Sequence, residues 1–168
     1  DFYADMNRWG AMMQIHLLFR RFEQHQQIVW NSKKGAVQDR TIYEDSIFAR
    51  MLHEAGFIDR RDYETYAGHF NIMKRYLVYP DLLLYLRVDP ETSLRRIAER
   101  GRKAEVGITL EYMQKLHEGY EEFIEEMDRY TQVLILNWNQ YLKMDEVVER
   151  ISKKTGNQRK FLRDLPKK

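Results

Sequence analysis

The chain has 168 residues, of which 28 are Lys or Arg and 26 are Asp or Glu, so its formal charge is +2. This balance lacks the basic excess of nucleic-acid binders, and the absence of cysteine excludes disulfide scaffolds, thiolate metal sites and cysteine nucleophiles. Apolar residues make up 43%, enough for a packed core, but no apolar run approaches the ~20 residues that cross a bilayer. We expect a soluble, cytoplasmic domain over residues 1–155 and a basic tail over residues 156–168, with no nucleic-acid or membrane partner.

The first half of the chain is predicted to be mainly helical. Residues 5–30 carry apolar side chains at helical spacing between polar ones, without proline, and predict one long helix. After a polar turn, residues 36–38 suggest a short strand. Two further helices are expected over residues 43–55, which Gly56 would end, and over residues 62–77, which ends before Pro80.

The second half alternates strands with helices. Residues 82–86 are apolar at every position, which predicts a strand buried on both faces of a parallel sheet, and residues 133–136 predict a second such strand. Helices are expected from Pro90, after an Asp89 cap, to Gly101, and over residues 109–130 and 145–154. This alternation predicts an α/β fold with a parallel sheet. Three strands are few for so many amphipathic helices, so we expect additional strands before residue 1.

The densest group of charged residues is an arginine cluster. Arg96 and Arg100 are four residues apart and share one face of a predicted helix, and Gly101 allows Arg102 to leave the helix end. Several guanidinium groups after a strand–helix unit can surround a phosphate and neutralise the charge that develops during phosphoryl transfer. Cations at a helix C-terminus are also favoured by the helix dipole alone, and that explanation has about equal weight.

A second candidate site is the sequence Asp39-Arg40-Thr41, which follows the predicted strand at 36–38. The carboxyl ends of strands are where open α/β sheets bind ligands, and an arginine there can hold a phosphate or position a carboxylate base. Without further context, a helix cap or a structural ion pair is the more common role of such residues.

The long first helix offers a third candidate. Gln14 and Arg21 lie two turns apart on one face, and Tyr3 precedes them. The glutamine amide has a donor and an acceptor, enough to bind the hydrogen-bonding edge of adenine or cytosine, and Asp45 could orient Arg21 beside it. A polar helix face is more often simply solvated.

The order of these motifs resembles the deoxynucleoside kinase family, in particular the bacterial deoxyadenosine, deoxycytidine and deoxyguanosine kinases. The resemblance covers roughly residues 2–124, and its motifs follow one collinear order. They are Phe2-Tyr3 with Gln14 and Arg21, Asp39 to Asp45, Pro80 to Leu86 with Pro90-Glu91-Thr92, Arg100-Gly101-Arg102, and Tyr120-Glu121-Glu122-Phe123.

The resemblance implies a helix-rich, P-loop kinase-like three-layer α/β sandwich with a parallel sheet and an arginine lid. It implies that ATP, with Mg²⁺, phosphorylates the 5′-hydroxyl of a 2′-deoxynucleoside, namely deoxyadenosine, deoxycytidine or deoxyguanosine. It also implies a homodimer formed through the first helix and the helix that starts near Asp62.

The resemblance assigns the deoxynucleoside to one group of residues. Gln14 would bind the base edge, the pair of Arg21 and Asp45 would favour purines or cytosine over thymine, and Phe48 would pack against the base. The 3′-hydroxyl is assigned to two residues, Tyr3 and Glu105.

A second group is assigned to phosphoryl transfer and ATP. Arg40 would steady the catalytic carboxylate and the 5′ end, with Asp39 near the magnesium. Arg96, Arg100 and Arg102 would form the lid, with Arg100 stacked on the adenine of ATP. The loop that contains Asn137 and Trp138 would lie beside the same adenine.

The sequence departs from the family in its phosphate-binding region. The motif G-x-x-x-x-G-K-[ST] does not occur in the chain, nor does the carboxylate that serves as general base after the second strand. We expect both to lie before Asp1, in roughly forty to sixty further residues, the size of a βαβ unit. Without the family's central first strand, a gap would separate the strands of this chain, which should not fold stably alone. Met13 stands where many relatives have Phe, which predicts a base pocket that is looser or differently selective.

Two other functions fit the same motifs. A nucleoside monophosphate kinase of the thymidylate type shares the fold and the arginine lid, although Arg21 and Asp45 would oppose the carbonyl and methyl groups of thymine. The other alternative is a non-catalytic descendant that binds nucleotides or a partner. An intact phosphate loop and a Glu after the second strand would favour a kinase, and replacement of either would favour a binding protein.

Overall fold

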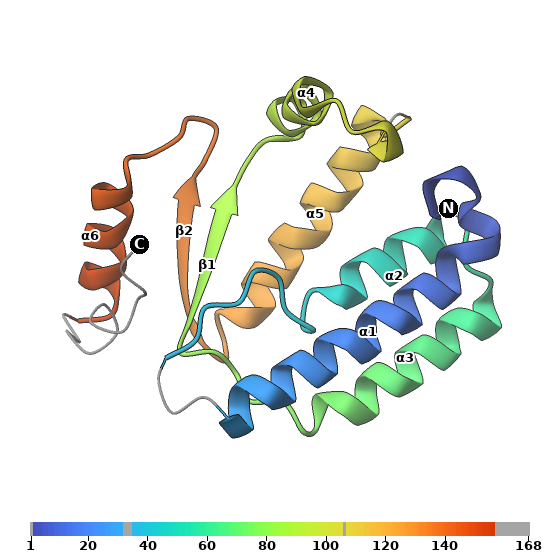
Figure 1. The fold of residues 1–168 in the computed structure, drawn as a ribbon, viewed down its shortest axis with the longest axis horizontal. Coiled ribbons are helices and arrows are strands. Elements are labelled where there is room, and N and C mark those ends of the chain that lie inside the picture. Colours follow the sequence, from blue (N-terminus) through green and yellow to red (C-terminus); the bar gives the residue numbers. More distant parts are fainter. Residues whose placement is uncertain (1, 32–34, 106, 157–168) are drawn as a thin grey trace.

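The computed structural model describes residues 2–31, 35–105 and 107–156 of the chain. Figure 1 shows a small sheet with α6 on one side and the helices α5, α2, α1 and α3 on the other. This arrangement agrees with the predicted α/β fold. In chain order the elements are η1 (Phe2–Ala4), α1 (Met6–Asn31), α2 (Asp45–Glu54), α3 (Arg60–Lys74), β1 (Leu82–Arg87), α4 (Pro90–Arg100), η2 (Lys103–Glu105), α5 (Leu110–Met127), β2 (Gln132–Asn137) and α6 (Met144–Lys154).

Short polar side chains start several of these helices. The Asp89 side chain accepts a hydrogen bond from the Thr92 N–H at 2.7 Å, Pro90 occupies the first turn of α4, and Gly101 ends the helix with a left-handed φ of 64°. These contacts confirm the predicted boundaries of α4, because the cap satisfies a free N–H group and glycine adopts a positive φ without strain.

The helix bounds differ from prediction by a few residues elsewhere. Helix α2 begins at Asp45 rather than at residue 43, because the Asp45 N–H closes a turn on the Ile42 carbonyl at 3.3 Å. Helix α3 spans Arg60–Lys74 instead of 62–77, since Asp59 caps it through the Asp62 N–H. Helix α5, predicted over residues 109–130, spans Leu110–Met127, with Thr109 as its N-cap, and ends three residues before the predicted end.

The described sheet has two strands, β1 and β2, paired in parallel from Leu82 opposite Gln132 to Arg87 opposite Asn137. The predicted third strand at residues 36–38 is wrong, because that segment forms no ladder in the structure. A gap between the strands of this chain was also predicted. No such gap separates β1 from β2, because these two strands are hydrogen-bonded directly to each other. Burial on both faces is also wrong for the described residues, since the side chains of Leu84, Leu86 and Ile135 are exposed.

The core lies between the sheet and the helices. Leu18 of α1, Ile47 of α2, Phe123 of α5 and Val133 of β2 belong to one buried cluster. Gly119 allows α5 to approach α2 closely, because a Cβ atom there would lie 2.6 Å from Ile47 Cγ2. The core therefore fixes α1, α2 and α5, the helices that carry Gln14, Asp45 and the other candidate residues nearby.

Among the described residues, no helix is both long enough and apolar enough to cross a membrane. The greater part of the predicted basic tail, residues 157–168, lies outside the described residues.

Candidate functional site

The predicted pair of Arg21 and Asp45 is formed, and it is the most buried ion pair described in the structure. Arg21 extends from α1 to Asp45 at the start of α2, where the side chains are 15% and 1% exposed, respectively. Arg21 Nη1 also donates a hydrogen bond to the Thr41 carbonyl at 3.4 Å. Burial lowers the pKa of Arg21, and the charge of Glu44 opposes this shift. The protein thus holds a donor and an acceptor in fixed positions away from water.

Gln14 lies on the same helix and is 4% exposed. Its side-chain oxygen is buried and has no hydrogen-bond partner among the described residues. The hydroxyls of Tyr43 and Tyr66 share this condition. Buried polar atoms are usually satisfied, because an unmade hydrogen bond leaves the cost of desolvation uncompensated. An unpartnered amide oxygen on the same helix as Arg21 is therefore available to a polar ligand.

Asp39 and Arg40 lie on the loop that leads into α2. Both residues are exposed, and Arg40 has a positive φ of 60°. Its guanidinium lies over the ring of Phe48, 5.6 Å from the centroid, and Phe48 meets Tyr120 edge-on. The predicted base-packing residue Phe48 and the predicted 5′-end residue Arg40 are therefore neighbours.

Two of the arginines predicted to form the lid are joined to the carboxylate predicted to bind the 3′-hydroxyl. Arg100 donates to both oxygens of Glu105 at 2.7 Å, and Arg102 lies 3.7 Å from the same carboxylate, whose side chain is 14% exposed. The elements η1 and η2 pack against each other, so the backbone segment that contains Tyr3 lies beside the segment that contains Glu105. The side chain of Tyr3 lies outside what the structure describes.

The third lid arginine has different partners. Arg96 donates to the Asn139 carbonyl at 3.0 Å, and its guanidinium lies 4.3 Å from the ring centroid of Tyr141. Trp138 packs edge-on against Tyr141, and its backbone N–H donates to the Arg87 carbonyl at 2.7 Å. Of the predicted ATP-side residues, Asn137 therefore ends β2, and Trp138 begins the loop that is bonded to α4 through the Asn139 carbonyl.

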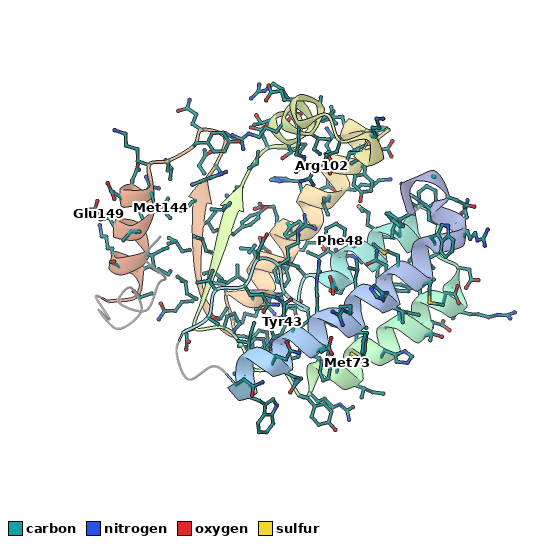
Figure 2. The ribbon with its side chains drawn as sticks, viewed as in Figure 1. Tyr43, Phe48, Met73, Arg102, Met144 and Glu149 are labelled. Atoms are coloured by element: carbon teal, nitrogen blue, oxygen red, sulfur yellow. The ribbon has the colours of Figure 1, made fainter. Side chains whose placement is uncertain are left out.

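In the view of Figure 2, Arg102 and Tyr43 lie on opposite sides of Phe48. A cavity of about 290 Å³ is present elsewhere, between the start of α1, the end of α2 and the start of α5. Its lining includes Met6, Phe57 and Tyr112 but neither Gln14 nor Arg102. A single kinase site would require Gln14 and Arg102 to share one cleft, and this stays a prediction because neither residue lines this cavity.

One residue of this region was given no role on the basis of sequence. Glu44 accepts the Thr41 N–H at 3.0 Å, and its pKa is raised, chiefly by burial, although Arg21 and Arg40 oppose the shift. In the sequence, Glu44 stands between Asp39 and Asp45, three acidic residues within seven positions. That spacing alone does not distinguish a buried carboxylate from a solvated one.

Comparison with known proteins adds an independent observation. The family model for deoxynucleoside kinases matches residues 1–160. A deoxyadenosine kinase from Dictyostelium discoideum is 45% identical over 151 residues, which cover 90% of this chain and 61% of that protein. A deoxyadenosine/deoxycytidine kinase from Bacillus subtilis is 40% identical over 126 residues, 73% of this chain and 58% of the relative. The chain thus spans about three fifths of the length of these relatives.

A solved deoxyadenosine kinase from M. mycoides with dCMP and dCDP bound is similar to this structure, with a TM-score of 0.78. It is 31% identical in sequence, and the match covers 92% of this chain and 78% of that one.

Proposed function

Since this chain belongs to the deoxynucleoside kinase family, we propose that its protein transfers the terminal phosphoryl group of ATP to the 5′-hydroxyl of a 2′-deoxynucleoside. Residues 1–155 are assigned to the kinase domain and residues 156–168 to a C-terminal tail. The observation that supports this proposal most directly is the buried pair of Arg21 and Asp45, which joins α2 to α1, the helix that also carries the unpartnered amide oxygen of Gln14.

These side chains suit particular bases. The Gln14 amide supplies one donor and one acceptor, and Arg21 and Asp45 add an oriented donor and acceptor. Adenine, cytosine and guanine each present exocyclic amino or carbonyl groups that can pair with such a set, whereas thymine would place a carbonyl and a methyl group against it. The relatives named above are kinases of deoxyadenosine and deoxycytidine, which supports the same substrates here.

The arginines serve the phosphate groups in this proposal. Arg96, Arg100 and Arg102 carry fixed positive charge at the end of α4, where a triphosphate would replace Glu105 as the partner of Arg100. Arg40 holds the 5′ end of the deoxynucleoside. A water-excluding set of guanidinium groups stabilises negative charge better in the transition state than bulk water does.

Magnesium is expected to bind together with ATP. Among the described residues, no group of three metal-ligating side chains lies together. Mg²⁺ is often held by one or two carboxylates and the substrate phosphates, so the exposed carboxylate of Asp39 fits as a single protein ligand. In that role Asp39 would orient the metal beside Arg40, and the metal would neutralise phosphate charge.

We also propose a homodimer through α1 and α3. Met12 and Phe19 are two turns apart on α1 and are 62% and 54% exposed, while Ile72 of α3 is 59% exposed. Gln26 joins α1 to the turn that follows α3 by donating to the Tyr76 carbonyl at 3.1 Å. Phe19→Glu is expected to convert the dimer to a monomer in sedimentation velocity, and a parent protein that sediments as a monomer contradicts the proposal.

A substrate panel tests the proposed reaction. The natural full-length protein is incubated with ATP, Mg²⁺ and each of deoxyadenosine, deoxycytidine, deoxyguanosine and thymidine, and the 5′-monophosphates are quantified. We expect thymidine to be the poorest substrate. A preference for thymidine overturns the role of Arg21 and Asp45, and phosphorylation of dTMP but of no nucleoside supports the thymidylate-type alternative. Nucleotide binding without any turnover supports the non-catalytic one.

A further inference from the structure

Both backbone polar groups of Thr41, the N–H and the carbonyl, form hydrogen bonds with side chains. Its N–H donates to Glu44 Oε1 at 3.0 Å, and its carbonyl accepts from Arg21 Nη1 at 3.4 Å. One short segment of backbone therefore connects Glu44 with the buried pair of Arg21 and Asp45. Arg40 immediately precedes this segment.

The backbone of Arg40 is in an unusual conformation. Its φ of 60° makes it the one non-glycine residue with positive φ among those that the structure describes. A side chain makes this region unfavourable, and such conformations persist where neighbouring contacts hold them. The hydrogen bond from the Thr41 N–H to Glu44 is the contact that directly follows Arg40 in the chain.

The side chain of Glu44 does not serve α2 itself. Glu44 occupies the N-cap position of α2, but its side chain makes no capping hydrogen bond to that helix. It turns back to Thr41 instead, where Arg21 and Arg40 interact electrostatically with its carboxylate. The Glu44 side chain therefore stabilises the loop before α2 and not the end of the helix.

We infer that Glu44 is a positioning residue for phosphoryl transfer: by binding the Thr41 N–H, it holds the left-handed backbone of Arg40 and thereby directs the guanidinium toward the 5′ end of the substrate. The Arg21 bond to the Thr41 carbonyl extends the same support to the base-binding pair. This inference rests on the proposed kinase function and adds to it a residue that need not touch the substrate.

The geometric part is tested by amide exchange, which requires no activity. In the full-length protein, hydrogen exchange of the Thr41 amide is measured by NMR for the parent, Glu44→Ala, Glu44→Gln and the control Glu64→Gln on the exposed face of α3. We expect Glu44→Ala to lose protection about tenfold, whereas Glu44→Gln keeps it because its amide oxygen accepts the same bond. Equal protection in the parent and Glu44→Ala overturns the inference.

The functional part is tested by steady-state kinetics on the same variants, well below their unfolding temperatures. Glu44→Ala is expected to lower kcat about tenfold, the scale of one lost hydrogen bond, with the KM for ATP changed less than about twofold. Glu44→Gln is expected to recover most of kcat, and Glu64→Gln to match the parent.

Two results contradict this part: a Glu44→Ala variant with the parent's kcat and only a lower unfolding temperature, or a Glu44→Gln variant as slow as Glu44→Ala. If the parent phosphorylates no deoxynucleoside, the proposed function fails instead, and amide exchange still decides whether Glu44 holds the Arg40 backbone.

Discussion

Gln14 is a polar side chain that the fold withdraws from solvent. Its amide is buried on α1, with an oxygen that has no partner among the described residues. Gln14→Ala should raise the KM for the deoxynucleoside by roughly tenfold to a hundredfold, because loss of a buried polar partner costs ~1–3 kcal/mol. Gln27→Ala, on the exposed surface of the same helix, is the matched control. An unchanged KM for Gln14→Ala would remove this residue from the base site.

The pair that Asp45 forms with Arg21 should contribute to the free energy of unfolding as well as to substrate binding. Asp45→Asn leaves the Arg21 guanidinium without its counter-charge in a site where Asp45 is 1% exposed. Breaking a buried pair from one side is costly, so the free energy of unfolding should fall by about 3 kcal/mol. Glu122→Gln breaks the exposed pair with Arg50 and should cost less than about 1 kcal/mol in the same urea titration. Equal effects of the two substitutions would contradict the burial argument.

At the scale of elements, His25 links α1 to the chain that follows α3. Its Nε2 accepts the Val78 N–H at 3.1 Å, its ring meets the edge of Tyr43, and burial lowers its pKa. The neutral ring is therefore the form that the folded state requires.

The direction in which the stability changes with pH depends on whether the folded or the unfolded chain binds more protons at His25. Below the ordinary histidine value of about 6.5, the unfolded chain binds a proton that folded His25 does not, so stability falls as the pH falls from 6.5 toward the lowered folded pKa. His25→Gln should flatten this part of the dependence of the unfolding temperature between pH 7.5 and 5.5. The same loss at acidic pH in His25→Gln would show that other groups cause it.

The packing of α5 on α2 gives a second prediction at this scale. A Cβ atom at Gly119 would lie 2.6 Å from Ile47 Cγ2, so Gly119→Ala should destabilise the protein by about 1–3 kcal/mol. Gly68→Ala on α3 is a control of opposite sign, since its Cβ would meet nothing within 4 Å and alanine favours helix by ~1 kcal/mol. Thermal unfolding of both variants measures the difference, and a stable Gly119→Ala would mean that the two helices separate easily.

At the scale of the whole molecule, the end of α4 is coupled to the start of the chain. Arg100 and Arg102 face Glu105 of η2, and η2 packs against η1. ATP phosphates would compete with this carboxylate for the arginines. The proposed lid and the proposed 3′-hydroxyl site should therefore respond to each other.

If Arg100 has the proposed lid role, Arg100→Ala is expected to lower kcat about a hundredfold, because the substitution removes a positive charge that would stabilise the transferring phosphoryl group. Deoxynucleoside affinity, measured by calorimetry without ATP, should change far less. Arg150→Ala on α6, which breaks only the surface pair with Glu146, should leave kcat unchanged. A fully active Arg100→Ala variant would exclude the lid role.

The sequence alone determined the elements whose signals are local. Caps such as Asp89 and terminators such as Gly101 act within one helical turn, so α4 was predicted almost to the residue. The family is likewise indicated by the collinear order of the motifs, which also predicted the pair of Arg21 and Asp45.

Only the tertiary structure decided what depends on contacts between distant segments. It showed that residues 36–38 form no strand, that one face of the sheet leaves Leu84 exposed, and that Glu105 is bonded to Arg100. It also revealed the bond between Glu44 and the Thr41 N–H. Strand pairing, burial and ion pairing depend on which atoms the folded chain brings together, and the linear order of residues does not contain those distances.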